Sequence, residues 1–153
     1  MIESFCDYGR DLRILLADDN EADVTVSLRA FSKATAKTEI SVVGSASDFF
    51  DYLENKNKYA DKKKYPLPDL ILLDINMPKS SGLETLCRIK AKSSLSHIPV
   101  VMLTSSKNHQ DIRNSYKYGA SGYLAKPVDY DDFVRMVEGF NYYWRCVSQL
   151  SII

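Results

Sequence analysis

The sequence predicts one α/β domain of the doubly wound class, because short buried strands alternate with amphipathic helices along the chain. Three runs of branched apolar residues are typical of parallel strands covered on both faces: Leu12–Ala17 (LRILLA), Leu70–Leu73 (LILL) and Val100–Leu103 (VVML). The longer stretches between them carry apolar residues at helical spacing. Since strand–helix–strand connections are right-handed, the helices cover both faces of one sheet, and ligands bind beyond the carboxyl ends of its strands.

The remaining elements follow in chain order with weaker signals. We expect two further strands at Ile40–Val43 (ISVV) and Tyr123–Leu124. The apolar stripes of the first and last helices are Val24, Leu28 and Phe31, and then Phe133, Val137, Phe140, Trp144 and Val147. Residues of the types that cap helix N-termini precede the five expected helices, namely Asn20, Ser47, Ser81, Asn108 and Asp129. Gly119 has the position of a C-terminal cap after the fourth helix.

Composition narrows the class of protein. The chain has 153 residues, and 20 Lys and Arg balance 20 Asp and Glu, so we expect neither nucleic acid nor an anionic membrane as a partner. No apolar run reaches the length of a membrane span. The three cysteines, Cys6, Cys87 and Cys146, form no disulfide framework, which predicts reduced thiols in a cytoplasmic protein. The lysine-rich segment 55–68 (NKNKYADKKKYPLP) is predicted to be a solvated loop.

Acidic, hydroxyl and amino side chains stand where the predicted strands end. Asp18 and Asp19 follow the first strand, Asp74 the third, Thr104 the fourth and Lys126 the fifth. Each alone is most simply a turn, cap or surface residue, but in a doubly wound sheet all of them lie at one edge. Crowded carboxylates repel unless a cation is present, and Mg²⁺ prefers oxygen ligands and takes more from a phosphate. An Asp can be a phosphoryl acceptor, which a lysine charge and a hydroxyl donor would stabilise.

Four motifs at these strand ends carry a family resemblance: LLADDN, LILLDINMPKSSGLE, VVMLTSS and GYLAKPVD. On them, the chain resembles the receiver domains of bacterial two-component response regulators. The resemblance implies a flavodoxin-like (βα)5 fold whose parallel sheet has the strand order 2-1-3-4-5. It also implies a receiver domain at residues 12–147, between an N-terminal extension (1–11) and a C-terminal tail (148–153).

The resemblance also implies the role of each site residue. Asp74 is the phosphoacceptor and, with Asp18, Asp19 and the backbone carbonyl of Asn76, holds Mg²⁺. Further roles fall on four residues: Thr104 and Lys126 bind the phosphoryl group, Thr104 and Tyr123 form the switch, and Pro127 follows a cis peptide bond. Gly82 is expected to permit a backbone conformation that a side chain would hinder.

The last expected helix is apolar on more than one side, with the run FNYYWRCV. Either it is a core helix with a frayed tail, or its outer side chains form a contact face. We favour a partner or homodimer face made by Tyr142, Trp144, Cys146 and Leu150. The DINMPKSSGLE segment with this aromatic tail is similar to the small regulators that serve bacterial phytochrome histidine kinases.

Three functional hypotheses follow. In the first, a stand-alone receiver takes a phosphoryl group from a sensor histidine kinase or a histidine phosphotransfer protein, assists its own phosphorylation and dephosphorylation, and signals through protein contacts. The second is a magnesium-dependent phosphohydrolase with an Asp nucleophile, but such enzymes need a second acid where this chain has Asn76. The third is a scaffold that has lost phosphorylation, although all five acidic, hydroxyl and lysine residues of the pattern are present.

Overall fold

Five parallel strands form one sheet in the order β2-β1-β3-β4-β5, which confirms the predicted fold class. The computed structural model describes residues 10–34, 37–77 and 81–150. The strands are β1 (Leu12–Ala17), β2 (Thr38–Val43), β3 (Leu70–Leu73), β4 (Val100–Thr104) and β5 (Gly122–Ala125). All three strongly predicted strands are present, and the two weak ones extend beyond their predicted bounds at one or both ends.

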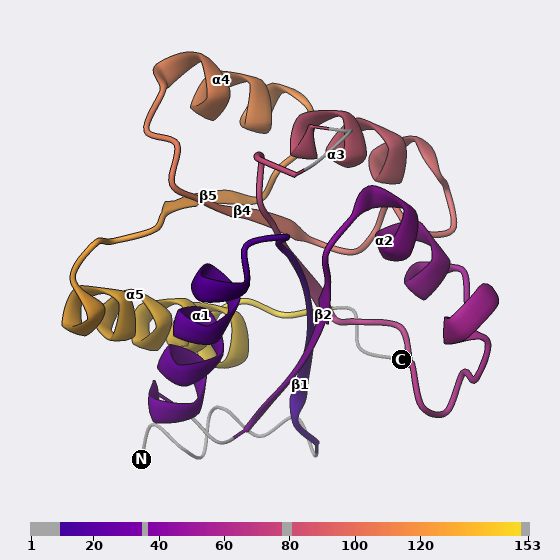
Figure 1. The fold of residues 1–153 in the computed structure, drawn as a ribbon, viewed down its shortest axis with the longest axis horizontal. Helices are drawn as coiled ribbons and strands as arrows, with labels where there is room; N and C mark the ends of the chain where they lie inside the picture. The colour runs from indigo at the N-terminus through magenta and orange to yellow at the C-terminus, as the bar shows by residue number, and fades with distance from the viewer. Residues whose placement is uncertain (1–9, 35–36, 78–80, 151–153) are drawn as a thin grey trace.

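Helices cover both faces of the sheet (Figure 1). On one face lie α1 (Glu21–Ala34) and α5 (Tyr130–Tyr142), which contact each other, and on the other lie α2 (Ala46–Leu53), α3 (Gly82–Ala91) and α4 (His109–Lys117). A short 3-10 turn, η2 (Asn57–Tyr59), follows α2, and a π turn, η3 (Tyr143–Val147), continues α5. Among the described residues, no helix is both long and apolar enough to cross a membrane.

Two apolar cores flank the sheet, because successive side chains of a strand point to opposite faces. Leu15 and Leu73 belong to the core beneath α2 and α3, whereas Leu16 and Leu72 belong to the core beneath α1 and α5. Every residue of β3 is buried, as expected for a central strand covered on both sides. This rigid centre fixes the position of whatever follows β3.

Four of the five predicted helix caps are confirmed. The side-chain oxygen of Asn20 accepts a hydrogen bond from the backbone N–H of Asp23 at 3.0 Å, and Ser81, Asn108 and Asp129 cap their helices in the same way. The prediction of Ser47 is wrong, since the Ser45 hydroxyl accepts from the Asp48 N–H and α2 begins two residues earlier than expected. Gly119 follows α4 with a φ of 105°, as a C-terminal glycine does.

The apolar stripes of α1 and α5 differ in part from the prediction. Leu28 is 37% exposed, and the small residues Ser27 and Ala30 are buried instead. At the other end, Val147 is exposed because η3 adds residues to the last turn and rotates the side chains that follow. On α1, the small buried residues Ser27 and Ala30 are compatible with its close contact to α5.

The lysine-rich segment after α2 is a loop of mostly exposed residues, as predicted, but its tyrosines anchor it to the core. The buried Tyr59 contacts Tyr52 and Tyr65, with ring centroids 5.3 and 5.0 Å apart. The Asn55 amide donates to the carbonyls of Tyr59 and Tyr65, both at 3.0 Å. The lysines of this segment are exposed, as are Asn57, Ala60, Asp61 and Leu67, whereas the two tyrosines pack against the core beneath α2.

The carboxyl-terminal residues also differ from expectation. Cys146 is disulfide-bonded, so the prediction that all three cysteines are reduced is wrong, while Cys87 is free and exposed. Cys6 lies outside the described residues. Trp144 and Leu150 pack partly against the core beneath α5, and Tyr142 is 50% exposed. Of the four residues expected on a partner face, Tyr142 therefore points most clearly to solvent.

Candidate functional site

The sheet register brings the predicted site residues together at one edge. Ala17 is paired with Leu73 and Thr104 with Ala125, so the residues that follow these strands are neighbours. The backbone N–H of Asp74 donates to the Ala17 carbonyl at 3.0 Å, and that of Lys126 to the Thr104 carbonyl at 2.8 Å. The backbones of both residues are thus positioned by hydrogen bonds at the strand ends, independently of their side-chain contacts.

Lys126 lies at the centre of an acidic cluster. Its Nζ is 2.7 Å from Asp18 Oδ2, 3.1 Å from Asp74 Oδ2 and 3.1 Å from Asp23 Oδ2. Asp18, Asp74 and Lys126 are buried, with 2%, 5% and 9% of their surface exposed. An ammonium group has three protons, and here each faces a different carboxylate.

The pKa values reflect this crowding. Burial disfavours the charged amine, but its hydrogen bond to Asp18 and the charges of Asp74 and Asp18 outweigh that effect and raise the pKa of Lys126 to about 12. Burial raises the pKa of Asp18 despite the bond to Lys126. The amine is therefore firmly charged, whereas the carboxylates around it carry more negative charge than it can balance.

Local turns orient the two buried carboxylates. The Asn20 N–H donates to Asp18 Oδ1 at 3.0 Å, and the Asn76 N–H donates to Asp74 Oδ1 at 3.1 Å. Each carboxylate thus has one oxygen held by its own loop and the other turned toward Lys126. This arrangement directs Asp74 Oδ2 into the site.

Gly82 keeps the backbone beside Asp74 compact. Its N–H donates to the Ile75 carbonyl at 2.7 Å, and a Cβ at this position would lie 2.1 Å from the Asp74 carbonyl oxygen. Its φ is not positive, since Gly119 is the only glycine with a positive φ in the described part of the chain. The expectation that a side chain would hinder the backbone here is confirmed, and the reason is close backbone approach and not a left-handed conformation.

Thr104 and Tyr123 are joined through one loop. Thr104 is fully buried at the end of β4, and the Tyr123 hydroxyl donates to the Ser106 carbonyl at 2.8 Å. Burial raises the pKa of the Tyr123 hydroxyl. A displacement of the loop after Thr104 would therefore change the hydrogen bond that holds the Tyr123 hydroxyl. The switch role of this pair stays a prediction.

The donor set is suited to a hard divalent cation. Asp18 and Asp74 present carboxylate oxygens beside Lys126, and the exposed Asp19 follows Asp18 directly. No three His, Cys, Asp or Glu side chains among the described residues already stand in metal-binding geometry. The amine of Lys126 lies between the two buried carboxylates, which explains why. All candidate ligands are oxygens, the type that Mg²⁺ and Mn²⁺ prefer.

Two features of the site differ from the sequence prediction. The Lys126–Pro127 peptide is trans, since no cis bond occurs in the described residues, so the prediction of a cis bond is wrong. The trans form is the ordinary preference before proline. The sequence did not predict Asp23 as a residue of the site, although its carboxylate contacts Lys126. An acid in the first turn of a helix is common, because it complements the helix dipole, and this masked its contact with Lys126.

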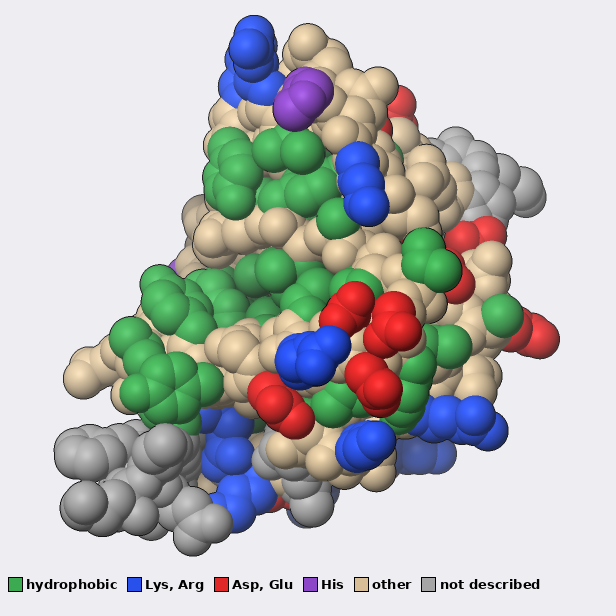
Figure 2. Space-filling view, turned by 90° about the vertical axis from the view of Figure 1, so that its left-hand side faces the viewer, with side chains coloured by type: hydrophobic (Ala, Val, Ile, Leu, Met, Phe, Trp, Pro, Cys, Tyr) green, Lys and Arg blue, Asp and Glu red, His purple; other side chains and the backbone are tan. Residues whose placement is uncertain are grey.

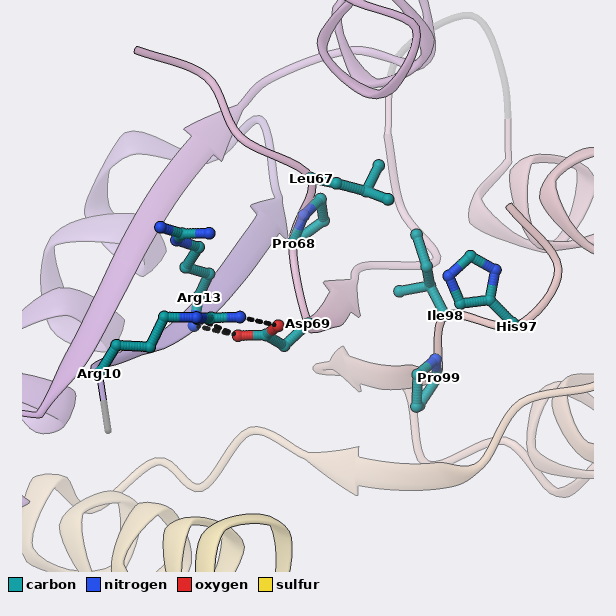
Figure 3. A pocket seen from close by; sticks show the side chains of 8 residues that line it. All are labelled: Arg10, Arg13, Leu67, Pro68, Asp69, His97, Ile98 and Pro99. Atoms are coloured by element: carbon teal, nitrogen blue, oxygen red, sulfur yellow. Dashed lines mark hydrogen bonds and ion pairs between the residues drawn. The ribbon is translucent and has the colours of Figure 1, made fainter. Parts of the chain in front are cut away.

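A separate cavity of about 210 Å³ lies at the opposite edge of the sheet (Figure 3). The Arg10 guanidinium makes a bidentate ion pair with Asp69, at 2.7 and 2.8 Å, and Asp69 also accepts from the Arg13 N–H at 2.9 Å. His97 and Pro99 line the other side of this cavity. Because Asp69 precedes β3 and Asp74 follows it, the whole strand separates this cavity from the acidic cluster.

Comparison with known proteins agrees with this geometry. The sequence model of one protein family, the response regulator receiver domain, matches residues 14–138. The chain belongs to the response regulator receiver family. Over 131 residues, this receiver is 34% identical to the response regulator Rcp1 of Synechocystis sp., an alignment that covers 86% of this chain and 87% of Rcp1.

Solved structures resemble this receiver over nearly its whole length. The phosphorylated cyanobacterial phytochrome response regulator RcpA has a TM-score of 0.84 at 33% identity, covering 93% of this chain and 99% of RcpA. The Mn²⁺-bound form of Rcp1 has a TM-score of 0.81 at 33% identity, covering 92% and 99%. Members of the receiver family are signalling phosphoacceptors that bind a divalent metal and interact with histidine kinases.

Proposed function

We propose that this receiver accepts a phosphoryl group on Asp74 from a cognate histidine kinase in a Mg²⁺-dependent reaction. The observation that carries the proposal is the position of the Asp74 carboxylate, buried and 3.1 Å from a lysine whose charge is secure. We assign the receiver to residues 12–147, between an extension (1–11) and a tail (148–153), and place it in the cytoplasm with the kinase. The family match to residues 14–138 supports these bounds.

The residues of the site divide the chemistry. Asp74 Oδ2 attacks phosphorus and forms the new P–O bond, while the bond from phosphorus to the donor breaks and its electron pair leaves with the donor. Lys126 and the Thr104 hydroxyl each bind an oxygen of the transferred group. Asp18, Asp19, Asp74 and the carbonyl of Asn76 would hold Mg²⁺, which supplies charge neutralisation for the phosphoryl oxygens.

The surface around Lys126 suits a protein donor. A pocket of about 460 Å³ beside it is lined by exposed Val26 and Val128 together with Lys107. Apolar side chains around a charged site are typical of a protein contact. Two similar structures, the phytochrome response regulator RcpA and the bacteriophytochrome response regulator RtBRR, support a phytochrome-type kinase as the partner. The phosphohydrolase alternative gains no support, because residue 76 is Asn, whose side-chain amide cannot serve as the general acid that such an enzyme needs.

Labelling with a small phosphodonor tests the proposal. Incubation with acetyl phosphate and Mg²⁺ should add one acid-stable, base-labile phosphoryl group, and Asp74→Asn should abolish it. Asp131→Asn is the matched control, since it removes an exposed Asp carboxylate from the first turn of α5. Labelling of Asp74→Asn to the wild-type level would show that the nucleophile is another residue.

We propose further that the receiver forms a homodimer through the β5 and α5 region, with Tyr142, Trp144, Cys146 and Leu150 at or near the contact. Figure 2 shows hydrophobic side chains gathered in a band on the side that carries α4, β5 and α5. A pocket between β5 and α5 is lined by Leu124, Met136 and Trp144, and Tyr142 and Tyr143 are exposed beside it. Exposed aromatic side chains of this kind favour protein contacts.

Sedimentation tests the dimer. The chain with both Tyr142 and Tyr143 changed to Ser should sediment as a monomer at concentrations where the wild type is dimeric. Val42→Thr, at the exposed opposite edge of the sheet, is the control and should leave the mass unchanged. A wild-type chain that sediments as a monomer at all concentrations would remove the dimer proposal without affecting that of phosphorylation.

A further inference from the structure

The third carboxylate on Lys126 comes from a helix and not from a strand end. Asp18 and Asp74 follow β1 and β3, as the chemistry of the site requires, whereas Asp23 lies in the first turn of α1. Its Oδ2 is 3.1 Å from Lys126 Nζ, and its side chain is 39% exposed. Asp23 is therefore the solvent-exposed partner of the ammonium group, whereas the other two carboxylates are buried.

We propose that Asp23 is a positioning residue that holds one of the three protons of Lys126 and thereby limits how much of the lysine's charge acts on a phosphoryl donor at Asp74. The inference rests on the proposed function, because it concerns the lysine that would bind the transferred group. It assigns no new chemistry to Asp23, which acts only through Lys126.

The geometry gives Asp23 a contact that can persist through phosphoryl transfer. The bond from Lys126 to Asp74 Oδ2 must give way when that oxygen takes phosphorus, and the Asp18 carboxylate is shared with the proposed cation. The Asp23 carboxylate is neither a proposed ligand nor the nucleophile, so its bond to the amine can remain. A lysine tethered in this way stays near the phosphoryl oxygens but presents a partly balanced charge to them.

A purely structural role does not account for this contact. The backbone N–H of Asp23 is already bonded to the Asn20 side chain, and Glu21 supplies another acid to the same helix turn. The two acids are thus alike in their effect on the helix, but of the two only Asp23 accepts a hydrogen bond from Lys126. Asp23→Asn and Glu21→Gln therefore remove the same charge from one helix turn, but only Asp23→Asn removes the ion pair with Lys126.

The first experiment tests the contact between Asp23 and Lys126 in the absence of phosphorylation. In the full chain with a chelator, the rate of acylation of the Lys126 amine by an amine-reactive ester is followed by peptide mass spectrometry. Asp23→Asn should raise this rate about two- to five-fold, the range expected for loss of a partly exposed ion pair, while Asp23→Glu and Glu21→Gln should match the wild type. Equal rates in Asp23→Asn and wild type, or an equal rise in Glu21→Gln, would overturn the inference. Equal unfolding midpoints confirm that both variants are folded.

The second experiment measures the consequence for the reaction. With acetyl phosphate and saturating Mg²⁺, Asp23→Asn should lower the KM for the donor about two- to five-fold with a smaller change in kcat, and Asp23→Glu should restore the wild-type value. An unchanged KM in Asp23→Asn would overturn the role in the reaction. If the wild type itself is not labelled, the proposed function fails, and the acylation rates still decide whether Asp23 holds Lys126.

Discussion

The two edges of the sheet carry ion pairs of opposite character. At the amino edge, one carboxylate, Asp69, is matched by one guanidinium, Arg10, through two hydrogen bonds. At the carboxyl edge, three carboxylates share the single amine of Lys126. The first arrangement is balanced in charge, and the second has negative charge left over. Because buried carboxylates in excess need a cation, the imbalance marks the edge that binds one.

The two edges differ in the features of a charged cluster that indicate function. Asp69 and Asp74 are comparably buried and stand at the two ends of the same strand. Burial of an acid by itself therefore distinguishes neither. What separates them is the number of acids for each cation, and the choice of a lysine in place of an arginine. Four changes should sharpen this contrast.

The largest effect is expected at the backbone of the carboxyl edge. In Gly82→Ala, the new Cβ would overlap the Asp74 carbonyl, so we expect the free energy of unfolding to fall by about 3 kcal/mol. Gly139→Ala in α5 is the control, where no atom lies within 4 Å and a gain of about 0.5 kcal/mol is expected. Urea unfolding of both variants provides the measurement. Equal stability of Gly82→Ala and wild type would show that this close approach is not required.

At the amino edge, removal of the acid should destabilise. Asp69→Asn leaves Arg10 without its anion and weakens the bond from the Arg13 N–H, and we expect a loss of about 2 kcal/mol in urea unfolding. Glu39→Gln breaks only a 3.9 Å exposed pair with Arg13 and should cost less than about 0.5 kcal/mol. Similar losses in the two variants would mean that burial does not strengthen the Asp69 pair.

Alkaline pH should separate lysine from arginine. The pKa of Lys126 is raised in the folded protein, so its stabilising effect is complete below about pH 10.5 and is lost as the pH rises toward 12, by about 2 kcal/mol in full. The stability difference between wild type and Lys126→Met should shrink over this range. That between wild type and Asp69→Asn should not, because Arg10 stays charged. A constant difference for Lys126→Met would contradict the raised pKa.

The smallest effect has the opposite sign to that at Asp69. Asp74→Asn removes one of the acids that crowd Lys126, so in a chelator we expect the free energy of unfolding to rise by about 1 kcal/mol. Millimolar Mg²⁺ should narrow or reverse the gap, because it stabilises the wild type more. Thermal unfolding with and without the ion tests this. Destabilisation by Asp74→Asn in the chelator would show that the carboxyl edge is as balanced as the amino edge.

Much of the fold could be predicted because its strongest signals are local. The runs that became β1, β3 and β4 are apolar throughout, and such runs have few other places than the centre of a covered sheet. Competing local signals caused the errors. Ser45 and Ser47 are equally good caps, and only the position of α2 on the core decides between them. Tyr59 and Tyr65 lie among lysines, and their burial depends on Tyr52, which belongs to another element.

By itself, the sequence determined the alternation of strands and helices, the strand ends at which acids stand, and the residues that make up the receiver pattern. These follow from hydrophobic periodicity and from the order of the motifs, which need no knowledge of distant contacts. The tertiary structure alone decided that Asp23 shares Lys126 with Asp18 and Asp74, that Gly82 is needed for close approach, and that Arg10 and Asp69 balance each other. Each of these depends on atoms brought together from separate elements, and the distance between such atoms is set only when the helices pack on the sheet.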